Sequence, residues 1–245
     1  MKKAILARSE IKEDAIYVSY PSSKIHSSNK LFQDFHNSEY NKENKVKFIF
    51  TGSIYSSDVI HSFIEALALL DFKLNGKEII FEIVAKEGVE NVKLALPTLT
   101  KHKGRIFVSP PVTVEEASLA IANADVAFLP YTFNHDILTS QAFPSKLSTY
   151  LSSAKNLFVI SPENSSLNIF LKENGLGVGF LSSNEPEEIA SEIIKLFTDS
   201  NLSAQRSNMD RIYLETFSVE MYQKILEKAF SEKSFGAPRK IQWLN

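Results

Sequence analysis

Short apolar runs alternate with longer segments of helical periodicity along most of this chain. The runs end at turn-forming residues, a pattern typical of strands that are buried on both faces of a parallel sheet. Strands are predicted at 46–52, 78–85, 104–110, 125–130, 156–161 and 177–183. Short connections between parallel strands require right-handed crossovers and helices that cover the sheet. The pattern therefore predicts an α/β fold, with a Rossmann-like parallel sheet of about six strands and helices on both faces.

Helices are predicted between these strands from apolar residues at three- and four-residue spacing. In the segment 56–74, five apolar residues share one helical face: Ile60, Phe63, Ile64, Leu67 and Leu70. Further helices are expected at about 89–102, 114–124, 145–153, 166–174, 185–200, 202–215 and 218–233. Pro186 suits the first turn of its helix. Gly175 suits the C-terminal cap of the helix before it.

The first 45 residues differ in composition from the rest of the chain. They are polar and charged without a sustained period, apart from a short apolar run at 16–20. Such a composition is typical of a linker or of an arm on the surface. We therefore expect three parts: an arm at 1–45, a Rossmann-like domain at 46–200, and C-terminal helices at 201–245 that pack on this domain.

Composition and charge exclude several classes of protein. The 245 residues include no cysteine, which rules out disulfides and thiol chemistry. A formal net charge of −2 gives no general attraction to nucleic acid or to an anionic membrane. No apolar run is long enough for a transmembrane helix, and Arg8 and Glu10 interrupt the first apolar stretch, unlike in a signal peptide. We expect a cytoplasmic protein with no nucleic-acid partner, and membrane association is not indicated.

The common nucleotide-binding and hydrolytic motifs are missing. No G-x-G-x-x-G follows the first strand, and neither a Walker A sequence nor G-x-S-x-G occurs. The glycines at 175, 177 and 179 follow a helix and lead into a strand, which is the reverse of the order in phosphate-binding loops. The five histidines show no H-x-x-x-H spacing, so we expect no metal site.

The most promising polar residues lie between the fourth and fifth predicted strands. A loop at 131–144 carries His135 and Gln141, and Ser145 and Lys146 begin the helix that follows. A helix that starts after a strand and a long loop presents free N–H groups and the positive end of its dipole to an anion. We expect the Ser145 hydroxyl to cap this helix. For Lys146, a solvated surface position is the alternative interpretation.

The chain resembles, in four segments taken in order, the C-terminal half of GT-B glycosyltransferases: VKFIFTGSIY, RIFVSPPVTVEEASLAIANADVAFLPY, FPSKLSTYLSSAKNLFVIS and FSVEMYQKILEKAF. The resemblance covers roughly 46–235 and is strongest to the large retaining group that includes glycogen-synthase-like and polysaccharide-assembly enzymes. It implies a domain that binds a nucleotide-sugar as substrate, without a cofactor or an obligatory metal. It also implies that the N-terminal, acceptor-binding half is missing or is supplied by a partner chain.

The same resemblance implies where a donor would lie. The diphosphate would face the end of the first strand, with Gly52 and Ser53, and the helix start, with Ser145 and Lys146. For Gly52, a tight turn without any ligand is the alternative. The nucleotide base would lie near the end of the third strand. The candidates there are Ser109 and Pro110, and His135 is the candidate in the donor loop.

Two departures from the family pattern concern the donor hydroxyls. The family often carries two carboxylates eight positions apart, and this chain has Gln141 and Thr149 in their places. Both are neutral, and a threonine hydroxyl lacks the two oxygens of a carboxylate clamp. The loop after Gly52 also lacks the family's usual arginine or lysine. We expect Gln141 and Thr149 to hydrogen-bond donor hydroxyls, and no catalytic residue can be assigned.

Three functions remain open at this point. The first is the donor-binding half of a hexosyltransferase of polysaccharide biosynthesis, inactive without its acceptor domain. The second is a glycosyltransferase-like domain with a degenerate donor site that binds without turnover, which the lost carboxylates favour. The third is an unrelated flavodoxin-like or regulatory α/β module, which would need paired aspartates that the strand ends lack. We expect the first.

Overall fold

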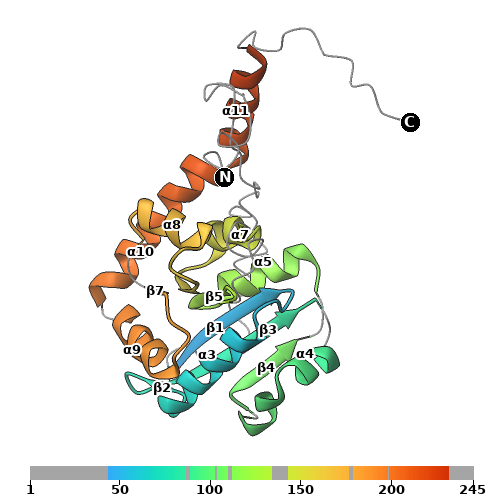
Figure 1. The fold of residues 1–245 in the computed structure, drawn as a ribbon, viewed down its shortest axis with the longest axis vertical. Coiled ribbons are helices and arrows are strands. Elements are labelled where there is room, and N and C mark those ends of the chain that lie inside the picture. Colours follow the sequence, from blue (N-terminus) through green and yellow to red (C-terminus); the bar gives the residue numbers. More distant parts are fainter. Residues whose placement is uncertain are drawn as a thin grey trace.

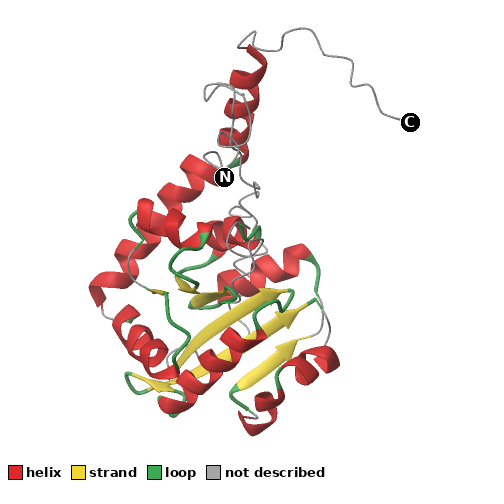
Figure 2. Ribbon diagram, viewed as in Figure 1, coloured by secondary structure: helices red, strands yellow, loops and turns green. Residues whose placement is uncertain are grey.

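The computed structural model describes residues 44–86, 89–102, 104–109, 112–133, 143–176, 179–197 and 199–231. In these ranges a seven-stranded sheet lies between two layers of helices, as Figures 1 and 2 show. All but the end of the expected arm at 1–45 lies outside the described residues. The division of the chain at residues 45 and 200 stays a prediction.

Six strands are parallel and form the body of the sheet in the order β4-β3-β1-β5-β6-β7. They are β1 (Lys45–Gly52), β3 (Lys77–Ala85), β4 (Ile106–Ser109), β5 (Val126–Pro130), β6 (Leu157–Ile160) and β7 (Phe180–Leu181). This arrangement confirms the predicted α/β fold with a parallel sheet of about six strands.

A seventh strand, β2 (Lys73–Leu74), pairs antiparallel with the start of β3. It lies in a segment for which the sequence predicts helix up to residue 74. The helix α3 (Ser57–Leu69) ends earlier, because Asp71 and Phe72 adopt positive φ angles of 51° and 50°. The strands β2 and β3 are joined through Asn75 and Gly76, also at positive φ, a residue pair typical of tight hairpins.

The helices divide between the two faces of the sheet. On one face lie α3, α4 (Val89–Ala95) and α9 (Pro186–Leu196), with the 3₁₀ turn η4 (Pro97–His102) after α4. The other face is covered by α5 (Val114–Asn123), α7 (Lys146–Ser153), α8 (Ser166–Glu173), α10 (Asp199–Ile212) and the π-helical turn η5 (Tyr213–Phe217). After η5, α11 (Val219–Ser231) extends away from the sheet (Figure 1).

Alternate residues of β1 fill two separate cores. Phe48 and Phe50 face α3, and Phe48 packs edge-on against Phe63 of that helix with ring centroids 5.4 Å apart. Ile49 faces the opposite core, under α5 and α7. Successive strand residues point to opposite faces, so an uninterrupted run such as Phe-Ile-Phe needs helices on both sides. Each buried side chain of this size contributes about 1.5–3 kcal/mol.

The sheet opens between its two central strands. β1 and β5 pair only at Phe48–Val126 and Ile49–Ala127. Beyond these residues β1 continues along β3 to Gly52, and β5 continues along β6. The strand order reverses here, because the chain moves from one half of the sheet to the other. In α/β sheets, ligands bind in the crevice beyond the carboxyl ends of the strands at such a point.

Gln205 of α10 joins the C-terminal helices to the sheet. Its side-chain amide donates to the Leu157 carbonyl and accepts from the Leu157 N–H, both at 2.9 Å. The side chain thus takes the place of a neighbouring strand at the start of β6. Both of these interactions are buried, and Gln205 is itself only 4% exposed.

Helix ends confirm two predictions and correct one. Gly175 has a φ of 73°, and the Leu176 N–H donates to the Leu171 carbonyl at 3.1 Å, so α8 ends in a Schellman motif as expected of a glycine cap. Pro186 occupies the first position of α9. The predicted Ser145 cap is wrong. Ser145 is helical, with φ −58° and ψ −30°, whereas a capping side chain needs a non-helical backbone to reach the first-turn N–H groups.

Candidate functional site

A cleft of about 560 Å³ opens at the carboxyl ends of β1 and β3, on the edge of the sheet where the central strands diverge. The starts of α5 and α7 form its other walls. Five of the residues predicted from the sequence line this cleft: Gly52, Ser53, Ser145, Lys146 and Thr149. They come from two segments about ninety residues apart, which the parallel sheet brings to the same edge.

The other predicted residues lie elsewhere or outside the described ranges. The Ser109 hydroxyl donates to Glu82 Oε1 at 2.7 Å, and Glu82 is in turn paired with Lys47. This network runs across β4, β3 and β1, and Ser109 is not part of the cleft lining. Pro110, His135 and Gln141 are not among the described residues, so their placement stays a prediction.

Gly52 turns the chain at the base of the cleft, next to the Lys146 side chain. Its φ of 102° is in the region that only glycine enters without strain. A Cβ atom on this residue would lie 3.4 Å from the Lys146 Nζ. This is an ordinary contact distance, so Gly52 is required by the turn of the chain out of β1 and not by the space that the lysine takes.

Lys146 brings a positive charge to this point from the start of α7. Its ammonium lies 4.3 Å from the centroid of the Phe50 ring. Phe50 is buried in the core, so its ring gives the ammonium a fixed support through a cation–π contact. The side chain also sits at the positive end of the α7 dipole. Cation, helix end and glycine converge on one small volume, which suits an anion.

The two helices that begin at the cleft differ in their caps. α5 is closed by a capping box, in which the Thr113 hydroxyl accepts from the Glu116 N–H at 3.2 Å and the Thr113 N–H donates to Glu116 Oε2 at 2.8 Å. Ser145 makes no side-chain capping bond at the start of α7. In α7 the Leu147 N–H donates to the Pro144 carbonyl at 3.1 Å instead, so a backbone carbonyl takes the place of a side-chain cap.

Tyr150 is buried behind the cleft, and its supporting role was not predicted from the sequence. Its hydroxyl accepts a hydrogen bond from the Thr51 N–H at 2.9 Å and lies 3.2 Å from the Thr51 hydroxyl. Alternate residues of β1 bond to opposite neighbours, and Thr51 faces the side where β5 has diverged. The Tyr150 hydroxyl therefore replaces the missing strand partner. Burial raises the pKa of Tyr150 to about 12, so the hydroxyl stays neutral at physiological pH.

The sequence held one signal for this role. Tyr150 is four residues after Lys146, so the two side chains leave α7 on the same face. The first residue of α7 brings a cation to the site, and a tyrosine one turn later bonds to β1. The helix is thereby fixed to the strand that ends at the site.

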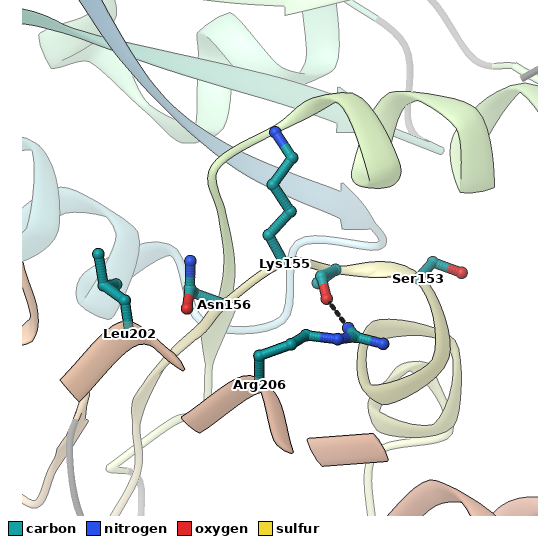
Figure 3. Close-up of a pocket in the computed structure, with 6 residues that line it drawn as sticks. Ser153, Lys155, Asn156, Leu202 and Arg206 are labelled. Atoms are coloured by element: carbon teal, nitrogen blue, oxygen red, sulfur yellow. Dashed lines mark hydrogen bonds between the residues drawn. The ribbon is translucent and has the colours of Figure 1, made fainter. Parts of the chain in front are cut away.

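A second, smaller cleft of about 360 Å³ lies at the opposite edge of the sheet, beside the start of β6 (Figure 3). Its two cations are already engaged. Arg206 donates to the Ala154 carbonyl and pairs with Asp210, and Lys155 pairs with Asp125 at 3.2 Å. With these charges neutralised and the switch point at the other edge, this cleft is a weaker candidate for the site.

The described ranges contain neither a candidate metal site nor a candidate membrane-spanning helix. No three His, Cys, Asp or Glu side chains gather there in a way that could hold a metal ion. None of the helices in these ranges combines the length and the hydropathy that crossing a membrane requires.

Comparisons of sequence and of structure gave different results. No protein-family model matches the sequence, and no curated protein matches it. Solved structures do match. The C-terminal domain of a glycosyl transferase group 1 family protein (LpcC) from Francisella tularensis superimposes with a TM-score of 0.52 at 15% identity, over 83% of this chain and 100% of that domain.

Two longer chains are also similar. HepE from Anabaena, solved in complex with UDP and glucose, has a TM-score of 0.61 at 15% identity, over 94% of this chain and 60% of its own length. A glycosyltransferase from Rickettsia africae has a TM-score of 0.62 at 15% identity, over 96% of this chain and 62% of its own. This protein thus has the Rossmann-like fold of a GT-B C-terminal domain, as predicted, and spans about three fifths of these two chains.

Proposed function

We propose that this chain is the donor-binding half of a nucleotide-sugar glycosyltransferase. The observation that carries the proposal is the cleft in which Gly52, Lys146 and the start of α7 converge. Its position at the switch point of the sheet is the usual ligand position in this class of fold. The similar HepE structures, solved with UDP and glucose and with UDP-glucose, give further support for a nucleotide-sugar ligand.

The chemistry follows from the charge that develops during sugar transfer. As the bond between the sugar and the diphosphate breaks, negative charge accumulates on the leaving nucleoside diphosphate. The Lys146 ammonium, the first N–H groups of α7 and the backbone at Gly52 and Ser53 stabilise that charge. Thr149 and Gln141 hydrogen-bond hydroxyls of the donor. The acceptor, and any base that activates it, come from an N-terminal half or a partner chain in the cytoplasm.

Replacing Lys146 with alanine tests the proposed site. We expect a roughly ten- to hundredfold rise in the Kd for UDP, which corresponds to about 1.5–3 kcal/mol for a charge-assisted hydrogen bond. The free energy of unfolding should change by less than about 1 kcal/mol, because the side chain is only partly buried. Isothermal titration calorimetry with UDP, GDP and ADP measures the affinity, and thermal unfolding measures the stability.

Lys77→Ala is the matched control. Lys77 is an exposed lysine at the opposite end of the neighbouring strand β3, so its loss changes the net charge equally without touching the cleft. Its affinity should equal that of the wild type. If none of the three nucleoside diphosphates binds the wild type at millimolar concentration, the proposed function is wrong.

A degenerate, purely binding domain is the second candidate function, and Thr149 favours it. A threonine lines the cleft where related enzymes are expected to carry a carboxylate.

Thr149→Glu should lower the Kd for UDP-glucose about tenfold if a ribose hydroxyl lies beside residue 149, since hydrogen bonds to charged groups are stronger than those between neutral groups. Thr149→Gln, similar in size but neutral, should change the Kd less than threefold. Weaker binding by the glutamate variant, measured by calorimetry, would place the donor hydroxyls elsewhere.

A further inference from the structure

The cleft is lined by a second lysine in addition to Lys146. Lys86, the first residue after β3, also lines it. Among the described residues of the lining there is no aspartate and no glutamate. Two lysines therefore line one cleft, and no acidic residue belongs to its described lining.

The two lysines approach Gly52 from different elements. The Lys86 N–H donates to the Gly52 carbonyl at 3.4 Å, which continues the pairing of β1 and β3 one residue beyond Gly52–Ala85. The Lys146 ammonium reaches the same glycine from α7. The Lys86 side chain is exposed and makes no hydrogen bond or ion pair with another residue in the ranges that the structure describes.

This arrangement fits two phosphate groups better than one. The Lys146 ammonium lies over the end of β1, and Lys86 leaves the end of the adjacent strand, about 4.8 Å away. Like charges that converge on one space repel each other, and the repulsion is relieved when an anion lies between them. A diphosphate ester that links a sugar to a nucleoside carries one negative charge on each phosphate, which matches the two ammonium groups.

We infer that Lys86 is a specificity-determining residue that makes the cleft select a nucleoside diphosphate over a nucleoside monophosphate. The inference rests on the proposed function and deepens it. Lys86 lies between the first two of the four segments that carry the resemblance to glycosyltransferases, and the resemblance assigns it no role. It supplies the second positive charge in a site whose loop after Gly52 carries neither arginine nor lysine up to Tyr55.

A monophosphate and a diphosphate should respond differently to the loss of Lys86. A single phosphate is expected to occupy the stronger position, at the start of α7, where N–H groups act together with Lys146. It therefore loses little when Lys86 is removed. A diphosphate uses both positions and loses one of its two cationic contacts.

The experiment compares the Kd values for UDP and UMP, with GDP and GMP as a second pair, by calorimetry on the full chain. The wild type should bind the diphosphate at least tenfold more tightly than the monophosphate. Lys86→Ala should weaken diphosphate binding about tenfold and monophosphate binding less than twofold, so that most of the preference disappears. Lys86→Arg should keep the preference, because the charge is retained. Lys77→Ala should leave all affinities unchanged.

The outcomes separate this inference from the proposal on which it rests. A Lys86→Ala protein that keeps the wild-type preference for the diphosphate would overturn the role of Lys86 and leave the nucleotide site in place. An equal loss of affinity for mono- and diphosphate would also overturn it. A wild-type protein that binds neither UDP nor GDP would overturn the proposed function itself.

Discussion

Adding one methyl group at Gly179 should destabilise this protein by about 2–5 kcal/mol. Gly179 has a φ of 76°, which costs an alanine about 1–2 kcal/mol. Its new Cβ would lie 2.7 Å from the Leu157 carbonyl oxygen and 3.1 Å from the Gln205 amide. The Gly179 backbone is held in place by two hydrogen bonds. Its carbonyl accepts from the Val159 N–H at 2.7 Å, and its N–H donates to Glu192.

Overpacking against fixed backbone adds about 1–3 kcal/mol to the conformational cost. Thermal unfolding of Gly179→Ala should show a fall in Tm of roughly 5–15 °C for a chain of this length. Gly76→Ala is the control, because Gly76 has a similar φ of 79° but no atom within 4 Å of the new Cβ. Gly76→Ala should lose only the about 1–2 kcal/mol that an alanine costs at a positive φ angle. Equal losses in the two variants would mean that the contact with Leu157 relaxes freely.

Gln205→Leu should have a loss of similar size from a different cause. Leucine fills about the same volume but can neither donate to the Leu157 carbonyl nor accept from its N–H, the two bonds that Gln205 makes at 2.9 Å. Each buried backbone group left without a partner costs about 1–3 kcal/mol. We therefore expect a loss of about 2–6 kcal/mol in the free energy of unfolding, measured by urea denaturation.

Gln223→Leu makes the same chemical change on the exposed surface of α11. Surface substitutions of this kind usually change stability by less than about 0.5 kcal/mol. A comparable loss in both variants would argue that leucine itself, and not the broken pairing at Leu157, is responsible. A Gln205→Leu protein as stable as the wild type would show that α10 does not depend on this amide.

The parallel sheet could be predicted because its strands are buried on both faces. Runs such as Val126–Leu129 and Leu157–Ile160 contain only apolar residues, and all of these residues are buried. Such runs allow few alternatives once helical segments separate them. The caps at Gly175 and Pro186 could also be predicted, because each depends on one residue type and its immediate neighbours.

Features that depend on competing local geometries were harder to predict. The segment 70–76 continues the apolar periodicity of α3, and only the positive φ angles at Asp71 and Phe72 divert it into a hairpin. Ser145 has the residue type of a cap, but it is already helical, and the Leu147 N–H donates to the Pro144 carbonyl instead. In both cases two local structures fit the sequence, and tertiary packing selects one of them.

The residues of the candidate site could be predicted only where a local sequence pattern or the family resemblance pointed to them. Gly52, Ser145 and Lys146 stand at a strand end and a helix start, which the sequence displays directly. Lys86 also directly follows a predicted strand, whereas Tyr150 gains its position from a partner far along the chain. The hydroxyl of Tyr150 meets Thr51 across 99 residues, and no periodicity encodes such a pairing.

The bond between Tyr150 and Thr51 also bears on how quickly a ligand can enter and leave. It joins the first wall of the cleft, at the end of β1, to the second, at the start of α7. These walls are therefore preorganised, and binding does not require them to lose conformational freedom. Exchange at this part of the site should be governed by diffusion and electrostatic attraction to the lysines, without a slow closing step.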